Sequence, residues 1–220
     1  GYILKGAPEQ IARDMVARDI RIKKLRDEKS QALDHAMTDP LTGAFNRRYF
    51  EEQLQDAFTL TKRQRDENVN TQIGVLMFDL DKFKSINDRF SHGEGDRVLK
   101  KFVECMQGTI REEDVFARLG GEEFGLIIRE SHKLEPEVLA KMVDRYRRSI
   151  SEQVFTGAVG APHTEPVTAS IGLVMYPNGA MIEKPDDLMG CADKAMYEAK
   201  TGGRNRADEC KGVDANGTRQ

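Results

Sequence analysis

The sequence predicts an α/β sandwich in which a central mixed, largely antiparallel sheet is flanked by helices and preceded by a long N-terminal helix. Three observations lead to this fold class. Residues 8–38 contain no glycine and no proline after Pro8, as expected of one continuous helix. Apolar runs at 73–80 and 167–175 have the length and composition of buried strands. Paired glycines at 120 and 121 separate two further short strands and indicate a hairpin.

The N-terminal helix allows two interpretations. Its apolar residues are spaced by four, seven and three, which fits a coiled-coil seam that Arg18 and Lys29 interrupt. It could equally pack on its own domain. Pro40 and Gly43 then favour a helix end, so we expect a stalk over 1–38, a globular domain over 39–207 and a disordered polar tail over 208–220. The apolar residues of the seam are Ile11, Met15, Ile22, Leu25, Leu33 and Met37.

Within the globular domain, helical spacing of apolar residues alternates with strand patterns. A helix around 50–58 precedes the strand at 73–80, and helical spacing returns at 98–106. The hairpin strands at 115–119 and 123–128 follow. Pro136 and Pro185 are placed as first residues of two further helices, on either side of the strand at 167–175.

Composition limits the possible partners and compartments. Of 220 residues, 34 are Lys or Arg and 37 are Asp or Glu, so no global positive field favours long nucleic acid. The three cysteines lack metal-ligand spacing and indicate reduced thiols in a cytoplasmic protein. No apolar run is long enough for a membrane span within this fragment. The chain begins with glycine, which is compatible with a piece of a longer protein that has an upstream membrane or sensor region.

Acidic residues follow the buried strand and the hairpin turn. Asp79 ends the run at 73–80, and a hairpin beside that strand would bring Glu122 and Glu123 close to it. Three carboxylates and a backbone carbonyl suit Mg²⁺, which prefers oxygen ligands. The alternative is a solvated strand end whose acids meet lysines, and this motif alone favours neither.

Neighbouring residues favour a nucleotide. Lys84, Lys200 and Arg204 could receive phosphates, and Lys200 and Arg204 lie about one helical turn apart. Asn87 and Asp96 could read a base, since a carboxylate accepts both donors on the Watson–Crick edge of guanine and adenine lacks that pair. His92 alone is more typical of a structural histidine than of a catalytic one.

These residues fall in motifs that together resemble the GGDEF domain, the catalytic domain of diguanylate cyclases. The resemblance covers about Asp39 to Arg206 and is specific because the motifs occur in order. They are "DPLTGAFNRR" at 39–48, "FDLDKFKSINDRFSHGEGD" at 78–96, "RLGGEEF" at 118–124, "ASIGL" at 169–173 and "ADKAMYEAKTGGRNR" at 192–206.

The resemblance implies a fold like that of nucleotidyl cyclases and the polymerase palm, and the condensation of two GTP molecules into cyclic di-GMP with release of two pyrophosphates. Mg²⁺, or alternatively Mn²⁺, would be held by Asp79, the Leu80 carbonyl and Glu122, with Glu123 as a further ligand or as an aid to the 3′-hydroxyl. Gly120 and Gly121 would let the backbone approach the nucleotide. The resemblance assigns GTP contacts to Lys84, Asn87, His92, Asp96, Gly120, Gly121, Lys200 and Arg204.

The resemblance also implies assembly and control. Each domain would carry half a site, so catalysis would need an antiparallel homodimer, and this favours the coiled-coil interpretation of residues 1–38. "REED" at 111–114 lies where the family has its RxxD site for inhibition by cyclic di-GMP. Arg111 and Asp114 would bind the product, with Arg145 as a third contact by helix position.

One position departs from the family pattern. Ser91 precedes His92 where the family commonly has glycine, and a positive φ at this position would strain serine. "GGEEF" keeps the carboxylate of "GGDEF", and no ligand side chain is lost. A non-catalytic module that senses GTP or cyclic di-GMP is the rival interpretation, although such domains generally lose a metal or glycine position. Asp96 disfavours other cyclic dinucleotide products.

Overall fold

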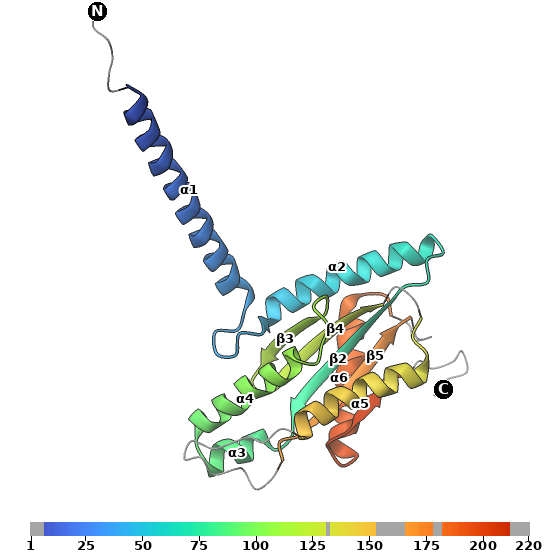
Figure 1. Ribbon diagram of the computed structural model, residues 1–220. Coiled ribbons are helices and arrows are strands. Elements are labelled where there is room, and N and C mark those ends of the chain that lie inside the picture. The colour runs from blue at the N-terminus through green and yellow to red at the C-terminus, as the bar shows by residue number, and fades with distance from the viewer. Residues whose placement is uncertain (1–6, 131–132, 153–165, 178–181, 212–220) are drawn as a thin grey trace, which may run out of the picture. The chain divides into compact units, whose positions relative to one another are not determined.

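The computed structural model describes residues 7–130, 133–152, 166–177 and 182–211. Contacts divide the chain into two units, Gly1–Thr38 and Asp39–Gln220. The first unit contains one helix, α1 (Ala7–Met37). The second contains a six-stranded sheet with helices on both faces (Figure 1).

The sheet is mixed and largely antiparallel, which confirms the predicted fold class. Its strand order is β1-β3-β4-β2-β5-β6, and the central strand β2 pairs antiparallel with both β4 and β5. The two outer pairs, β1 with β3 and β5 with β6, are parallel. The strands are β1 (Phe45–Asn46), β2 (Gln72–Leu80), β3 (Val115–Gly120), β4 (Glu123–Glu130), β5 (Ala169–Tyr176) and β6 (Ala207–Glu209).

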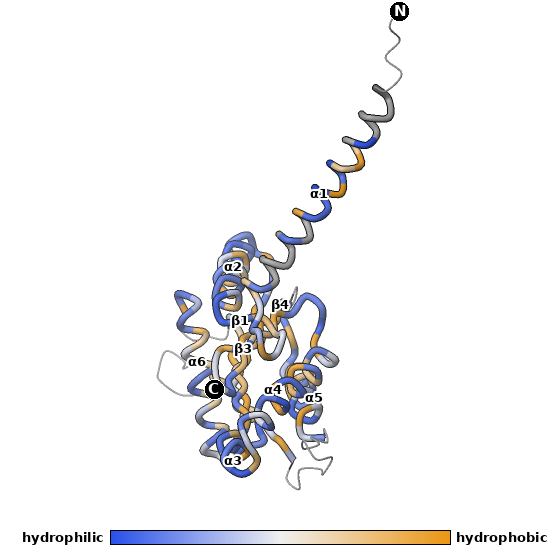
Figure 2. Tube along the Cα trace, turned by 90° about the vertical axis from the view of Figure 1, so that its left-hand side faces the viewer, coloured by the Kyte–Doolittle hydropathy of each residue, from blue (hydrophilic) through white to orange (hydrophobic). Residues whose placement is uncertain are grey.

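Two apolar cores lie on opposite faces of the sheet. Helices α2 (Arg47–Asp66) and α6 (Pro185–Thr201) cover one face, where Phe50 and Met196 are buried. Helices α4 (His92–Gln107) and α5 (Pro136–Ser151) cover the other, around Phe102 and Tyr146. Figure 2 shows apolar residues concentrated along the strands between these helices.

Strand β2 is buried along all nine residues, as its continuous apolar run predicts. Side chains alternate across a strand, so Leu76 and Phe78 enter the core under α4 and α5, whereas Val75 and Met77 enter the core under α2 and α6. Asp79 shares the parity of Met77. The strand therefore directs the Asp79 carboxylate toward the face that α6 covers.

Three short elements were not predicted. β1 contains only two residues, and α3 (Phe83–Arg89) is a separate helix before α4. The third element corrects the expected polar tail over 208–220, because Ala207–Glu209 form β6 and the Cys210 amide donates to the Leu173 carbonyl at 2.7 Å. Residues 212–220 lie outside the described part of the chain.

Helix α1 presents large apolar side chains to solvent when it is considered by itself. Met15 is 51% exposed and Leu25 is 56% exposed. Met37 is half-buried, and the side chains of Ile11 and Leu33 lie outside the described residues. No described helix is both long enough and apolar enough to cross a bilayer.

Gly172 on β5 sets how closely α6 packs on the sheet. A Cβ at this position would collide with the backbone of Ala192 and Met196, which cannot rotate away. We expect Gly172→Ala to lower the free energy of unfolding by about 3 kcal/mol. The control is Gly190→Ala within α6, where no heavy atom lies within 4 Å of the added methyl group and a small stabilisation is expected. Urea denaturation followed by circular dichroism measures both stabilities. Equal stability of Gly172→Ala and Gly190→Ala would contradict the packing argument.

Candidate active site

The end of β2 carries a buried carboxylate with a cationic partner. Asp79 is 8% exposed, and its Oδ2 lies 2.8 Å from Nζ of Lys200, in the last turn of α6. Burial raises the pKa of Asp79 above its ordinary value, the Lys200 ammonium opposes this shift, and the charges of Glu122 and Glu123 add to it. The cost of burying the Asp79 carboxylate therefore exceeds the stabilisation that Lys200 provides, and the two glutamates add smaller contributions.

The turn between β3 and β4 depends on two glycines with positive φ. Gly120 has φ 152° and Gly121 has φ 54°, and a bulge falls between Arg118 and Gly120. No heavy atom lies within 4 Å of a Cβ built on either glycine, so the turn's backbone is open to a ligand. The glycines are thus required by backbone conformation, and they leave the approach to the turn unobstructed.

An arginine holds this turn against the start of the domain. Nη2 of Arg118 donates to the Gly121 carbonyl at 2.8 Å, and its Nη1 donates to Oδ1 of Asp39 at 3.1 Å. Burial would raise the pKa of Asp39, but hydrogen bonds from Thr42 and Arg118 outweigh burial and lower it. The ionised Asp39 carboxylate therefore anchors Arg118 and the turn that precedes Glu122.

Strand register brings the hairpin acids to the end of β2. Asp79 pairs with Glu123 across the β2–β4 ladder, and the Leu80 amide donates to the Glu122 carbonyl at 3.3 Å. Glu123 is exposed and Glu122 is half-buried. The structure thus brings together the strand ends that carry Asp79, Glu122 and Glu123, as the hairpin argument anticipated.

Three carboxylates and a lysine surround the end of β2, where a metal ion would have to bind. Among the described residues, no three His, Cys, Asp or Glu side chains converge as a ligand group. The carboxylates nevertheless suit a hard cation, because Glu122 and Glu123 lie close enough to Asp79 for their charges to raise its pKa, and a divalent ion would offset that negative charge. A divalent ion bound here would compete with Lys200 for Asp79.

Helices α3 and α4 position the two residues expected to read a base. The Asn87 side chain occupies the space that a Cβ at Gly95 would fill, so the absence of a side chain at Gly95 allows Asn87 to lie against α4. Asn87 is half-buried and Asp96 is exposed. Lys84 and His92 are also exposed, and no described hydrogen bond or ion pair joins either of them to Asp79.

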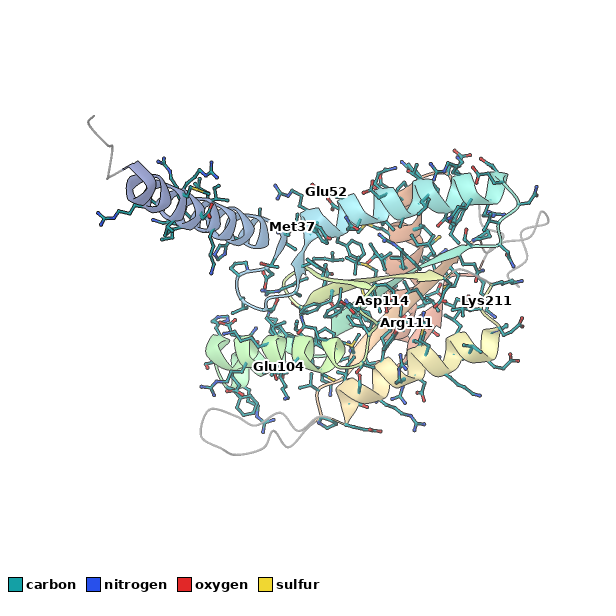
Figure 3. All side chains as sticks on the ribbon, turned by 45° about the horizontal axis from the view of Figure 1, so that its top comes forward. Met37, Glu52, Glu104, Arg111, Asp114 and Lys211 are labelled. Atoms are coloured by element: carbon teal, nitrogen blue, oxygen red, sulfur yellow. The ribbon has the colours of Figure 1, made fainter. Side chains whose placement is uncertain are left out.

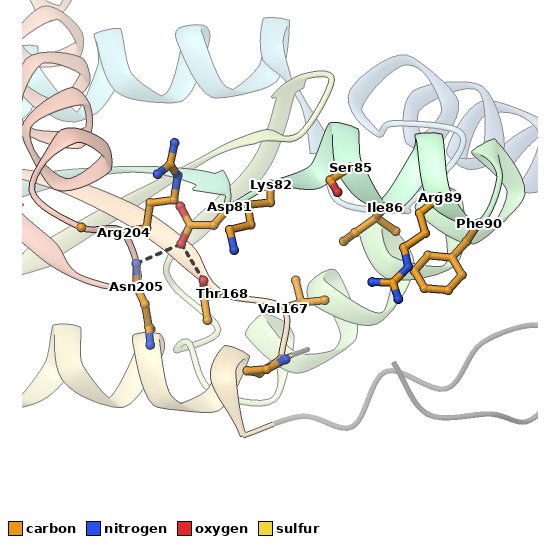
Figure 4. A pocket seen from close by; sticks show the side chains of 12 residues that line it. Asp81, Lys82, Ser85, Ile86, Arg89, Phe90, Val167, Thr168, Arg204 and Asn205 are labelled. Atoms are coloured by element: carbon orange, nitrogen blue, oxygen red, sulfur yellow. Dashed lines mark hydrogen bonds between the residues drawn. The ribbon is translucent and has the colours of Figure 1, made fainter. Parts of the chain in front are cut away.

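The loop after α6 has a strained backbone that a buried carboxylate holds in place. Arg204 and Asn205 both have positive φ, at 65° and 46°. The Asn205 amide donates to Oδ2 of Asp81 at 2.9 Å, and the Thr168 hydroxyl donates to the same oxygen at 2.6 Å (Figure 4). The Ser170 hydroxyl donates to Oδ1 of Asp81, also at 2.6 Å. Asp81 therefore fixes the loop that presents Arg204.

A cavity of about 370 Å³ lies beside this loop. Lys82, Arg89 and Arg204 supply its cationic groups, and Ile86 and Phe90 supply apolar walls (Figure 4). Arg204 is thus exposed at the edge of a cavity with cationic walls, and no described ion pair occupies its guanidinium.

Sequence reasoning missed three positioning residues. Asp81, Arg118 and Asp39 were not among the residues selected from the sequence. Their roles depend on contacts across 79 and 124 residues of sequence, which no local spacing indicates. The available signal was weak: an acid directly after a fully apolar strand is expensive to bury unless it is hydrogen-bonded.

Comparison with known proteins agrees with this geometry. The family model described as "Diguanylate cyclase, GGDEF domain" matches residues 36–206, which include every element from β1 to α6.

The chain belongs to the GGDEF family.

Similar proteins include diguanylate cyclases from several bacteria. VdcA of Vibrio cholerae, a diguanylate cyclase, is 32% identical over 190 residues, which are 86% of this chain and 52% of that protein. DgcT of Escherichia coli, a probable diguanylate cyclase, is 34% identical over 171 residues, which are 78% of this chain and 35% of that protein. The chain thus spans about a third of the length of DgcT and about half of the length of VdcA.

A solved structure covers both units of the chain. It contains the coiled coil and GGDEF domain of DgcB from Caulobacter crescentus in complex with c-di-GMP. It has a TM-score of 0.77 and 25% sequence identity, and it covers 93% of this chain and all of that one. This similarity shows that the chain has the architecture of the GGDEF fold.

The serine that departs from the usual GGDEF pattern adopts a positive φ. Ser91 has φ 155°, in the region that favours glycine, so its backbone carries the strain that was expected of serine with a positive φ. Its hydroxyl accepts a hydrogen bond from the Glu94 amide at 3.4 Å and caps α4. This cap partly offsets the backbone cost, because it satisfies one amide at the start of the helix.

The RxxD residues of this GGDEF domain lie side by side before β3 (Figure 3). The Arg111 amide donates to Oδ2 of Asp114 at 3.0 Å. Asp114 is buried, and its Oδ1 has no hydrogen-bond partner within the described residues. Burial raises the pKa of Asp114, and the amide and charge of Arg111 oppose this shift.

Tyr146 links Arg145 on α5 to the Arg111–Asp114 pair. The guanidinium carbon of Arg145 lies 5.5 Å from the centre of the Tyr146 ring. Burial raises the pKa of the buried Tyr146 hydroxyl, the Asp114 charge raises it further, and Arg145 opposes both. Arg111, Asp114 and Arg145 therefore influence one residue, Tyr146.

Proposed function

We propose that this chain is a diguanylate cyclase that condenses two GTP molecules into cyclic di-GMP and releases two pyrophosphates. One observation carries the proposal: in a GGDEF chain, Asp79 is the penultimate residue of the central strand, in register with Glu123, beside the open Gly120–Gly121 turn and 2.8 Å from Lys200. Carboxylates, an open backbone and a phosphate-binding cation are thereby assembled at one edge of the sheet.

The guanine base is recognised by Asn87 and Asp96. A carboxylate at Asp96 accepts the two donors of the Watson–Crick edge of guanine, which adenine does not offer. Lys84, Lys200 and Arg204 neutralise the phosphates, and the open backbone of Gly120 and Gly121 allows the nucleotide to approach the hairpin. His92, at the exposed start of α4, completes the proposed GTP contacts.

Asp79, the Leu80 carbonyl and Glu122 would hold Mg²⁺ or Mn²⁺, with Glu123 as a further ligand or as an aid to the 3′-hydroxyl. When bound, the ion supplies neutralisation of the charge that develops on the phosphoryl oxygens. The chain's own residues prepare the site: Lys200 pairs with the Asp79 carboxylate before the ion binds and is then free for the phosphates, and Arg118 holds the turn that precedes Glu122.

The reaction requires two copies of the domain, because each binds one GTP. In an antiparallel homodimer, the 3′-hydroxyl held by one domain attacks the α-phosphate held by the other, and pyrophosphate leaves. The exposed apolar residues of α1 support a coiled-coil stalk over 1–38 that brings two copies together. The catalytic domain then extends over 39–207.

The first test is to incubate the purified chain with GTP and Mg²⁺ and resolve the nucleotides by chromatography. Cyclic di-GMP and two equivalents of pyrophosphate are expected. Binding of GTP without any turnover would instead support the rival function, a sensing module. A parallel reaction containing equal ATP tests Asp96, since substantial incorporation of adenosine would count against guanine recognition.

Cyclic di-GMP also acts as an inhibitor in this proposal, bound by Arg111, Asp114 and Arg145. The buried, unpartnered Oδ1 of Asp114 supports it, because guanine donors can satisfy that atom. The described DgcB structure, which contains c-di-GMP, is also consistent with product binding by this family.

Arg111→Ala is expected to raise the cyclic di-GMP concentration for half-inhibition by about tenfold or more, because it removes a charge-assisted contact. Inhibition curves with added product would measure the change. Arg48→Ala, which removes an exposed arginine on α2, is the control and should leave the curve unchanged. Equal inhibition curves for the unchanged chain, Arg111→Ala and Arg48→Ala would show that the inhibitory site lies elsewhere.

A further inference from the structure

A buried acid at the end of β4 already contacts the arginine of the RxxD pair. Oε1 of Glu130 lies 2.8 Å from Nη1 of Arg111. The Glu130 side chain is 4% exposed, whereas the Arg111 side chain is 46% exposed. The pair thus joins a fixed, buried carboxylate to a guanidinium whose remaining donors face solvent.

The contact changes what Arg111 offers to an anion. The charge of Glu130 is the largest cause that holds the pKa of Arg111 above its ordinary value, so the two groups interact as ions. A phosphate approaching the guanidinium therefore meets a pair whose charges largely cancel. It also meets repulsion from a carboxylate that cannot turn out to solvent.

We propose that Glu130 competes with cyclic di-GMP for the Arg111 guanidinium and so raises the product concentration at which inhibition begins. This inference rests on the proposed inhibitory site and adds an acid that sets the sensitivity of that site. Arg111 cannot leave Glu130 without stranding a buried charge, so part of the ligand's binding free energy is lost to this competition.

The test is the affinity of the full chain for cyclic di-GMP, measured by isothermal titration calorimetry without GTP or metal. Glu130→Gln keeps the shape and an acceptor for Arg111 but removes the charge. We expect it to bind cyclic di-GMP about fivefold more tightly than the unchanged chain. Glu52→Gln removes the same charge from an exposed position on α2 and should change the affinity by less than twofold.

A double-mutant cycle shows whether the effect passes through Arg111. Once Arg111→Ala is present, Glu130→Gln should increase the affinity by clearly less than in the unchanged chain, because the residue for which it competes is gone and only its direct repulsion of the ligand remains. Glu130→Asp, which retracts the carboxylate by one methylene group, provides a second variant and should bind with intermediate affinity. Thermal melts verify that each variant is folded.

Unchanged or weaker binding by folded Glu130→Gln would overturn the inference, and weaker binding would show that Glu130 orients Arg111 for the ligand instead. An equal gain in the Arg111→Ala background would also overturn it. Because this titration needs no turnover, a chain that binds product as expected yet makes none from GTP would refute the proposed cyclase activity and leave the inference about Glu130 intact.

Discussion

Glu122→Ala is expected to reduce the rate of cyclic di-GMP formation by about 10³-fold or more. Glu122 follows the Gly120–Gly121 turn, and its carbonyl accepts from the Leu80 amide beside Asp79. Removing its carboxylate takes away a proposed metal ligand, and loss of one preorganised electrostatic group at a reacting centre commonly has an effect of this size. Initial rates with GTP and Mg²⁺ measure it directly.

The matched control is Glu104→Ala, which removes an exposed carboxylate from α4 that pairs with Lys101 at the surface. This variant should retain the unchanged chain's rate, because surface ion pairs contribute little to stability. Near-normal turnover by folded Glu122→Ala would refute the metal assignment at the hairpin.

Asp81→Ala is expected to lower the free energy of unfolding by about 3 kcal/mol or more and to reduce turnover as well. The change strands three donors, the Thr168 and Ser170 hydroxyls and the Asn205 amide, and Ser170 is completely buried. It also releases the left-handed backbone at Arg204, so contact with GTP phosphates should weaken. Urea denaturation and the dependence of rate on GTP concentration measure the two effects.

Asp193→Ala, which removes an exposed carboxylate on α6, is the control for Asp81→Ala and should leave stability nearly unchanged. If Asp81→Ala were equally stable, the carboxylate would not anchor the loop as its hydrogen bonds indicate. If folded Asp81→Ala kept the KM for GTP of the unchanged chain, Asp81 would not be needed to position Arg204.

Much of the fold could be predicted because its strongest signals are local. The apolar run of β2 and the glycine pair between β3 and β4 mark elements whose character depends on neighbouring residues. Strands β1 and β6 could not be predicted, since two or three residues carry no periodicity and their pairing depends on distant partners. The separation of α3 from α4 depends on the positive φ of Ser91, which its side chain does not reveal.

The residues of the candidate site were also only partly predictable from the sequence. Asp79, Lys200 and the hairpin acids were selected because their motifs occur in order, and the structure joins Asp79 to Lys200 at 2.8 Å. The acids that act through other residues were overlooked or not interpreted. Asp39, Asp81 and Glu130 each act on a partner that is distant in sequence, and only Asp81, which directly follows an apolar strand, carries even a weak local signal.

The measurement that tests the central claim most directly is the rate of cyclic di-GMP formation over a dilution series of the chain, with GTP and Mg²⁺ in excess and the association state followed by light scattering. Two half-sites predict formation of cyclic di-GMP whose rate per chain falls as the dimer dissociates. No cyclic di-GMP at any protein concentration would contradict the cyclase assignment. A constant rate per chain after the protein has become monomeric would contradict the paired half-sites.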